Sequence, residues 1–409
     1  MVYTVFNHKN QTHKEGCLME NSIYHSRIIY NYLKQLNLCR VYSQTYIQHI
    51  LSIILSVFAI GFKGKTVNFE QSGSCHRTTI AHFLNQGKWD DSRLESILKQ
   101  PVIDIIYHEA KITGKPVFCI VDDTISSHTK PSSKALHPIE DAYFHQSHLK
   151  GKQDYGHQAV AVMLSCNGLV LNYTLIMYNK SKSEIDIVRE IADELPIPPV
   201  ISCFLCDSWY TTGKLSDAFI KKGFCTIGAL KTNRVIFPCG IKQGIHEFAL
   251  YISKEETSLV TVGSRKFYIY RYEGKLNGID NAVVLISYPE NAFHNPKGLR
   301  AFVCTDVSLT TMEILNAYVK RWPVELFFRQ SKGKLALDKY QIRSSQGIRR
   351  YWLLMSLVHL LCCTKTGKFC SFENGYSCLQ KEIQKERILY IYQCGAKHIP
   401  LDDILDLVA

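Results

Sequence analysis

The chain has 409 residues, and 48 Lys and Arg outnumber 36 Asp and Glu to give a formal net charge of +12. A hydrophobic content of 46% is enough for a globular core and excludes a disordered chain, while the charge favours an anionic partner. No signal-peptide core opens the sequence, and the apolar stretch at 50–62 is too short to span a bilayer. We therefore expect a cytoplasmic protein with reduced cysteines and no membrane partner.

Residues 1–115 form a helical N-terminal region with amphipathic runs. Within it, SGSCHRTTIAHFLN has a turn at Gly73, a candidate cap at Ser74 and a helix that opens with His76 and Arg77. This pattern is similar to the second helix of a helix-turn-helix, whose first turn contacts DNA. Arg77 is then a candidate DNA contact. A helix with a basic first turn is also compatible with simple packing, so both interpretations stay open.

From residue 116 the pattern changes to alternating strands and helices. The apolar run PVFCIVDDT ends in Asp122 and Asp123, and the run VISCFLCDSWY contains Asp207. Between them, strands at 157–166 and 169–178 flank Asn-Gly, a strong hairpin signal. Further elements are predicted from periodicity and capping residues: a helix at 183–195, a helix at 212–222 and a strand at 224–230.

An acid at the end of a buried strand needs a physical reason. An isolated buried carboxylate is costly unless it is paired or binds a metal, and convergent carboxylates suit Mg²⁺ or Mn²⁺. Parallel neighbouring strands would bring Asp123 and Asp207 together at one edge of the sheet. Either residue alone is also explained as a turn or cap residue. Cys203 and Cys206 lack a second ligand pair for zinc, so core packing is the favoured explanation.

The segment from Tyr318 to Lys332 reads YVKRWPVELFFRQSK and places a phenol and two cations around one carboxylate. On a single helix, Tyr318, Arg321, Glu325 and Lys332 would fall within a sector of roughly 60°. Pro323 interrupts such a helix, so the shared face is expected only from Glu325 onward. Nine Lys or Arg and two acids lie between positions 318 and 350, which favours phosphate contact. The candidate DNA contacts in this stretch are Tyr318, Arg321, Arg329, Lys332, Arg349 and Arg350.

The spacing Y-x2-R-x3-E-x6-K resembles the signature of the hairpin-forming, cut-and-paste DDE transposases of bacterial insertion sequences. The resemblance implies an RNase H-like core and three metal-binding catalytic carboxylates, carried over to Asp123, Asp207 and Glu325. Asp122 is the rival for the first position. The resemblance also implies two Mg²⁺ ions, which Mn²⁺ would replace, and phosphate contacts from Tyr318, Arg321 and Lys332.

The expected fold is α/β, with an RNase H-like catalytic core interrupted by a β-rich insertion. The expected divisions are a helical DNA-binding region, the two parts of the core separated by the insertion, and a helical tail, at 1–115, 116–232, 233–305, 306–370 and 371–409. Some members of the family hold a flipped base with a Trp from the insertion, but the four Trp of this chain lie elsewhere.

The function implied is metal-dependent DNA cleavage at insertion-sequence ends, hairpin formation and strand transfer into target DNA. The implied partners are the terminal inverted repeats, target DNA and a second copy of the chain in a synaptic dimer, located at the nucleoid. Two alternatives remain: an inactive or domesticated DNA-binding protein of the same fold, and a structure-selective nuclease. The carboxylates disfavour the first alternative, and the set of Tyr318, Arg321 and Lys332 disfavours the second.

Overall fold

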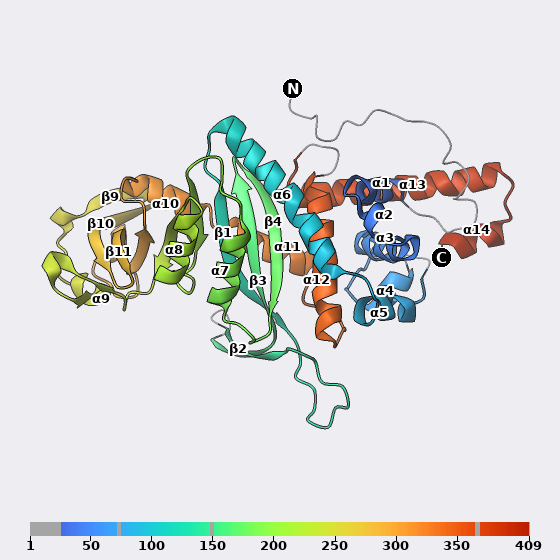
Figure 1. The fold of residues 1–409 in the computed structure, drawn as a ribbon, viewed down its shortest axis with the longest axis horizontal. Coiled ribbons are helices and arrows are strands. Elements are labelled where there is room, and N and C mark those ends of the chain that lie inside the picture. The colour runs from blue at the N-terminus through green and yellow to red at the C-terminus, as the bar shows by residue number, and fades with distance from the viewer. Residues whose placement is uncertain (1–25, 72–74, 148–150, 365–368, 409) are drawn as a thin grey trace.

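The computed structural model describes residues 26–71, 75–147, 151–364 and 369–408. Within these ranges, one mixed β-sheet of twelve strands forms the centre of an α/β fold. Figure 1 shows the N-terminal helices α1–α5 and the C-terminal helices α13 and α14 grouped beyond one side of the sheet. Strands β9–β11 lie at the opposite end of the molecule (Figure 1). Helical N-terminal and C-terminal regions therefore accompany the sheet, as the sequence predicted.

The N-terminal region contains six helices in the part of the chain that the structure describes. They are α1 Arg27–Gln35, α2 Leu38–Val41, α3 Gln44–Phe58, α4 Thr66–Gln71, α5 Arg77–Asn85 and α6 Asp91–Thr113. The apolar stretch at 50–62 falls largely on α3, which is buried. No helix among the described residues is long and apolar enough to cross a membrane. The cap of α5 is His76, whereas the predicted turn at Gly73 and cap at Ser74 lie outside the described residues.

The middle of the sheet follows the strand order β4-β3-β1-β5-β6. Strands β3 and β4 are antiparallel to their neighbours, and β5 and β6 run parallel to β1. Positive φ angles at Asn167 and Gly168 confirm the predicted hairpin. The predicted helices and strand are confirmed as α7, α8 and β6. The bounds are β1 Phe118–Ser127, β2 Tyr143–Ser147, β3 Lys152–Cys166, β4 Leu169–Tyr178, α7 Glu184–Glu194, β5 Ser202–Cys206, α8 Gly213–Lys221 and β6 Phe224–Leu230.

The two faces of this sheet are covered by different helices. Side chains of α6, α7, α8 and α12 join one hydrophobic cluster with one face of β1, and those of α10 and α11 join a second cluster with the other face. Cys206 belongs to the first cluster and Cys203 to the second, and both are free thiols. Their burial on opposite faces agrees with core packing.

Residues 233–305 are rich in strands, but these strands continue the same sheet. Strand β12 pairs with β6, and β11 and β10 follow outward from it. A third hydrophobic cluster lies within this part of the molecule. Its strands and its α-helix are β7 Val235–Ile236, β8 Gln243–Gly244, α9 Ile245–Phe248, β9 Ser258–Val262, β10 Arg265–Leu276, β11 Ile279–Pro289 and β12 Arg300–Cys304.

Five helices complete the described chain. They are α10 Thr311–Val319, α11 Pro323–Lys334, α12 Ser345–Thr364, α13 Phe372–Ala396 and α14 Leu401–Val408. The break between α10 and α11 falls before Pro323, which occupies the first turn of α11. A proline fits there because the N–H it lacks would have no partner within the helix. The sequence predicted this interruption.

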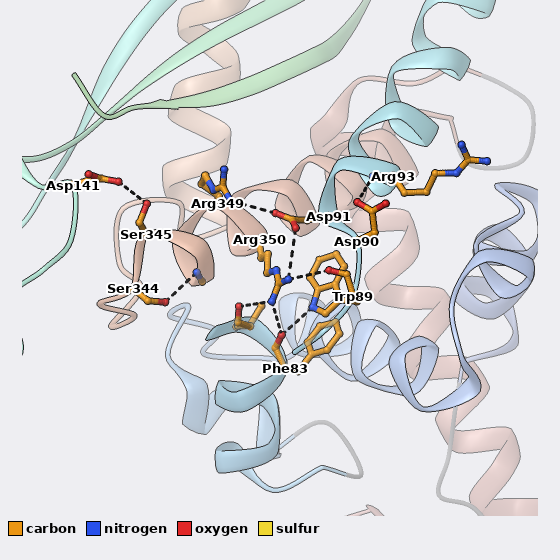
Figure 2. Close-up of polar contacts among 12 residues, drawn as sticks. Phe83, Trp89, Asp90, Asp91, Arg93, Asp141, Ser344, Ser345, Arg349 and Arg350 are labelled. Atoms are coloured by element: carbon orange, nitrogen blue, oxygen red, sulfur yellow. Dashed lines mark hydrogen bonds and ion pairs between the residues drawn. The ribbon is translucent and has the colours of Figure 1, made fainter. Parts of the chain in front are cut away.

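Arg350 joins α12 to the N-terminal helices (Figure 2). Its side chain is 2% exposed, and the guanidinium donates to the backbone carbonyls of Phe83, Leu84 and Trp89. The same group lies 4.6 Å from the centre of the Trp89 ring and 3.6 Å from a carboxylate oxygen of Asp91. A guanidinium enclosed in this way cannot reach a phosphate. This placement contradicts the expectation that Arg350 contacts DNA.

We predict that replacing Arg350 by Ala lowers the free energy of unfolding by about 3–5 kcal/mol, the range for breaking a buried ion pair. Three carbonyls and Asp91 would lose their donor, and the stacked Trp89 would lose a neighbour. Urea denaturation measures this loss. The neighbouring Arg349 is the matched control, because its side chain is 56% exposed and its Ala variant should lose no more than about 1 kcal/mol. Equal losses in the two variants would contradict the structural role of Arg350.

Candidate active site

The two adjacent acids of β1 lie inside the strand. The parallel pairing of β1 with β5 ends at Val121 and Cys206, but the antiparallel pairing with β3 continues to Ser127. The sequence predicted a strand that ends at the acids, whereas the strand continues because β3 is longer than β5. Asp122 and Asp123 are therefore the first residues of β1 beyond the part that pairs with β5.

Successive side chains of a strand point to opposite faces of the sheet, so Asp122 and Asp123 are separated. Asp122 shares its face with Ile120, which packs in the cluster formed with α10 and α11. Asp123 lies on the face of Val121, in the cluster with α6, α7 and α8. There its carboxylate accepts a hydrogen bond of 2.5 Å from the amide of Gln158 on β3.

Asp207 directly follows β5 and continues the register of the parallel pair. Because Val121 pairs with Cys206, the next residues along the two chains are Asp122 and Asp207. Asp207 therefore lies beside the two acids of β1, and its charge acts on both of them. One oxygen of Asp207 also accepts bonds from the backbone amides of Trp209 (2.9 Å) and Tyr210 (3.3 Å).

Arg321 connects the strand to the signature helix. It lies in the turn between α10 and α11, donates a 2.6 Å bond to Asp122 and forms a second ion pair with Glu325, in the first turn of α11. The guanidinium also lies 6.0 Å from the centre of the Tyr318 ring. One cation thus bridges two of the carboxylates, with the Tyr318 ring near it.

Lys332 fixes the far end of α11 to the same strand. Its ammonium donates to the hydroxyl of Thr124 at 2.7 Å and to the carbonyl of Ile125 at 2.9 Å. Lys332 lies two turns after Glu325 on α11, which agrees with the expected shared face. Arg321 and Lys332 therefore bond to β1 at two points, and Glu325 lies between them in the sequence.

Two carboxylates of this site have raised pKa values because they are buried. Burial raises the pKa of Asp122 to about 7; Arg321 opposes this rise, and the nearby Asp207 adds to it. Burial also raises the pKa of Asp123 to about 6; the hydrogen bond from Gln158 opposes this rise, and Asp207 adds to it, as it does for Asp122. Buried carboxylates with raised pKa values are stabilised by a cation, which Arg321 provides for Asp122.

The donor atoms fit a divalent metal, although they are not assembled around one position. Among the described residues, no group of three or more His, Cys, Asp or Glu is arranged to hold a metal ion. Asp122, Asp207 and Glu325 nevertheless offer the carboxylate oxygens that Mg²⁺ prefers. Arg321 holds Asp122 and Glu325 as their counter-ion and would have to release them to a metal.

The remaining basic residues named from the sequence are dispersed. Arg329 is exposed on α11, Arg77 is exposed at the start of α5, and Arg349 is exposed on α12 with Asp91 at 3.6 Å. Only Arg329 shares its helix with Glu325. Arg77 belongs to the N-terminal helices and Arg349 to α12.

Two exposed tryptophans border the site, and sequence reasoning did not assign them a role. Trp209 is 50% exposed two residues after Asp207, and Trp322 is 59% exposed beside Arg321. The ammonium of Lys231 lies 5.1 Å from the centre of the Trp209 ring. The other two tryptophans are buried. The signal available in the sequence was the position of Trp209 and Trp322 near Asp207 and Arg321, because Trp is enriched at binding interfaces.

Comparison with known proteins identifies the family. A family model described as the transposase DDE domain matches residues 113–361, more than half of the chain. None of the curated proteins matches the sequence significantly. Among solved structures, a piggyBac transposase synaptic complex with hairpin DNA aligns with a TM-score of 0.40 and 13% identity, covering 93% of this chain and 82% of that chain. That likeness is weak, and the assignment rests on the family model. The chain belongs to the transposase DDE domain family.

Proposed function

We propose that this protein is a DNA transposase that cleaves the ends of an insertion sequence, forms a hairpin on DNA and transfers the cleaved end into target DNA. The observation that carries the proposal is that Arg321 pairs with both Asp122 and Glu325, while Asp207 follows the end of β5 next to Asp122. Membership of the DDE family supports the same chemistry. The terminal inverted repeats, target DNA and a second copy of the chain are the proposed partners.

An RNase H-like core is part of this proposal. Its support is the strand order β4-β3-β1-β5-β6, in which three antiparallel strands are followed by two strands parallel to β1. This arrangement brings the end of β5 beside the middle of β1. Asp122 and Asp207 therefore become neighbours, although they are 85 positions apart in the sequence.

We assign the first catalytic carboxylate to Asp122. The resemblance to insertion-sequence transposases favoured Asp123, with Asp122 as its rival. Asp122 is supported by its bond to Arg321 and by the register that sets it beside Asp207. Asp123 faces the opposite helices and is bonded to Gln158. Its proposed role is to anchor β1 to β3 behind the site.

Phosphate binding falls to Arg321, Lys332 and Tyr318 in this proposal. Two Mg²⁺ ions held by Asp122, Asp207 and Glu325, or Mn²⁺ in their place, would activate the attacking oxygen and stabilise the leaving oxygen. Arg321 would exchange its carboxylate partners for a DNA phosphate, because its planar guanidinium binds both anions in the same bidentate way. Lys332 holds α11 on β1, so Glu325 keeps its position while Arg321 moves.

The assignment of the first carboxylate is tested by cleavage of end-labelled DNA carrying the inverted repeats that flank the gene. We expect Asp122→Asn, Asp207→Asn and Glu325→Gln to lower Mg²⁺-dependent cleavage by about a thousandfold, several kcal/mol of transition-state stabilisation. Asp123→Asn is the matched control, and its cleavage rate should stay within about tenfold of the wild-type rate. The products are resolved on a denaturing gel, where a hairpin migrates slowly.

Two results would contradict these proposals in different ways. Loss of cleavage in Asp123→Asn with activity retained in Asp122→Asn would reverse the assignment of the first carboxylate. Double-strand breaks without a hairpin band at any time would leave a metal-dependent nuclease in place of the proposed transposase.

The counter-ion role of Arg321 predicts competition with metal ions. Replacing Arg321 by Gln removes a positive charge from Asp122 and Glu325, so Mn²⁺ should bind the DNA-free protein about tenfold more tightly, or about 1.4 kcal/mol. Isothermal calorimetry at pH 8 measures this affinity. Arg329→Gln is the control, because Arg329 is exposed on the same helix. Unchanged or weaker Mn²⁺ binding in Arg321→Gln would show that the guanidinium does not compete with the metal.

The exposed ring of Trp209 is the proposed stacking surface for a base displaced during hairpin formation. Every base has a flat aromatic face, so an indole stacks on it without regard to sequence. Trp209 is supported by its exposure, its position two residues after Asp207 and the ammonium of Lys231 beside it. Such an ammonium would also suit a neighbouring phosphate.

Trp209→Ala should slow hairpin formation on paired DNA by about tenfold, since stacking contributes about 1–3 kcal/mol per base. The defect should shrink on DNA that lacks the base next to the cleaved phosphate, because no base then has to be held. Rates on the two substrates come from the same gel assay. Tyr392→Ala, an exposed ring on α13, serves as the control and should show no dependence on the missing base. A defect in Trp209→Ala that persists on abasic DNA would argue for a role other than stacking.

A further inference from the structure

The turn after β5 holds Asp207 through its backbone as well as its side chain. The hydroxyl of Thr211 lies 2.7 Å from the carbonyl oxygen of Asp207 and 2.7 Å from that of Ala229 on β6. The amide of Thr212 donates to the carbonyl of Tyr210, and Thr212 caps α8. The direction of the Asp207 carboxylate therefore depends on where residues 207–212 are held.

Arg234 reaches this turn from the connection between β6 and β7. Its guanidinium donates to the carbonyl of Thr211 at 2.9 Å and to the carbonyl of Asn277 at 2.8 Å. Asn277 lies at the tip of the β10–β11 hairpin, in the strand-rich segment 233–305. A single side chain thus connects the turn that carries Asp207 with a hairpin about seventy positions further along the chain.

A close backbone contact at the same place is independent of Arg234. Gly278, at the tip of the hairpin, lies so near Gly213 that a Cβ atom added to Gly213 would stand 2.0 Å from the Gly278 carbonyl oxygen. Gly278 also has a φ of +86°, which favours glycine. The hairpin tip is therefore packed directly on the first residue of α8.

We propose that Arg234 is a positioning residue that sets the Asp207 carboxylate by fastening its turn to the β10–β11 hairpin. The inference rests on the proposed function, because Asp207 is taken as a catalytic carboxylate. The strand-rich segment then has a part in the reaction beyond any contact of its own with DNA. A shift of the hairpin on binding DNA would be passed to Asp207 through two hydrogen bonds and the contact between Gly213 and Gly278.

The kinetic test compares Arg234→Gln with Arg234→Lys and Arg300→Gln. Arg300 is the matched control, because it also donates to backbone carbonyls, those of Lys297 and Leu299, but does not contact the turn. Arg234→Gln should lower kcat for end cleavage at least tenfold and raise the Mg²⁺ concentration for half-maximal rate, with DNA affinity within twofold of wild type. Arg234→Lys should recover part of kcat, since an ammonium can still donate to one carbonyl.

Hydrogen exchange of the peptide covering 207–212 tests, without any cleavage, whether the Arg234 hydrogen bonds hold this turn. Exchange there should rise in Arg234→Gln and stay at the wild-type rate in Arg300→Gln, because the amides of Trp209 and Tyr210 lose the support of the turn. Unchanged exchange together with an unchanged kcat overturns the proposal, as does a loss of DNA affinity equal to the loss of activity. If exchange rises in Arg234→Gln but the wild-type protein cleaves no DNA, Arg234 holds the turn as proposed and the proposed function is wrong.

Discussion

The ion pairs of Arg321 with Asp122 and Glu325 determine how the signature helix sits on the sheet. Arg321 and Asp122 are 199 positions apart, and their 2.6 Å contact is largely buried. A buried carboxylate left without a cation would destabilise the fold, so the guanidinium is required wherever Asp122 is enclosed. If Asp122 and Glu325 bind metal as proposed, the bond that stabilises the protein would also keep them from the metal. The proposed function therefore requires a cost in stability when Arg321 releases them.

The alternation of a β-strand decides which of two adjacent acids can join this arrangement. Strand, hairpin and helix positions followed from local patterns, such as the Asn-Gly turn at Asn167 and the Ser183 cap of α7. The choice between Asp122 and Asp123 did not, because both follow the same apolar run. It depends on which face α11 covers, and that is a tertiary property. The register of β1 with β5, together with the side occupied by Arg321, separates the two acids.

Charge counted along the sequence was a weaker guide than burial. The basic stretch at 318–350 suggested one surface for phosphate, yet Arg350 is enclosed by the loop around Trp89. Arg349 and Arg350 are adjacent on α12 and point in different directions, since a helix turns about 100° per residue. The apolar face of α12 could have indicated that Arg350 points inward, but its carbonyl partners come from α5 and the loop that follows it, far away in the sequence.

The continuity of the sheet explains why the strand-rich segment can influence the site at all. A separate domain on a flexible linker would move without disturbing β5, but β12 is paired with β6, the immediate neighbour of β5. Backbone pairing of this kind resists sliding, because a shift of one residue would turn every side chain of β12 to the wrong face. We therefore expect any displacement of the strand-rich segment mainly at its outer strands and hairpin tips. Arg234 fastens the β10–β11 tip to the turn of Asp207, so, if Arg234 positions Asp207 as proposed, a displacement of the strand-rich segment would reach the site at this tip.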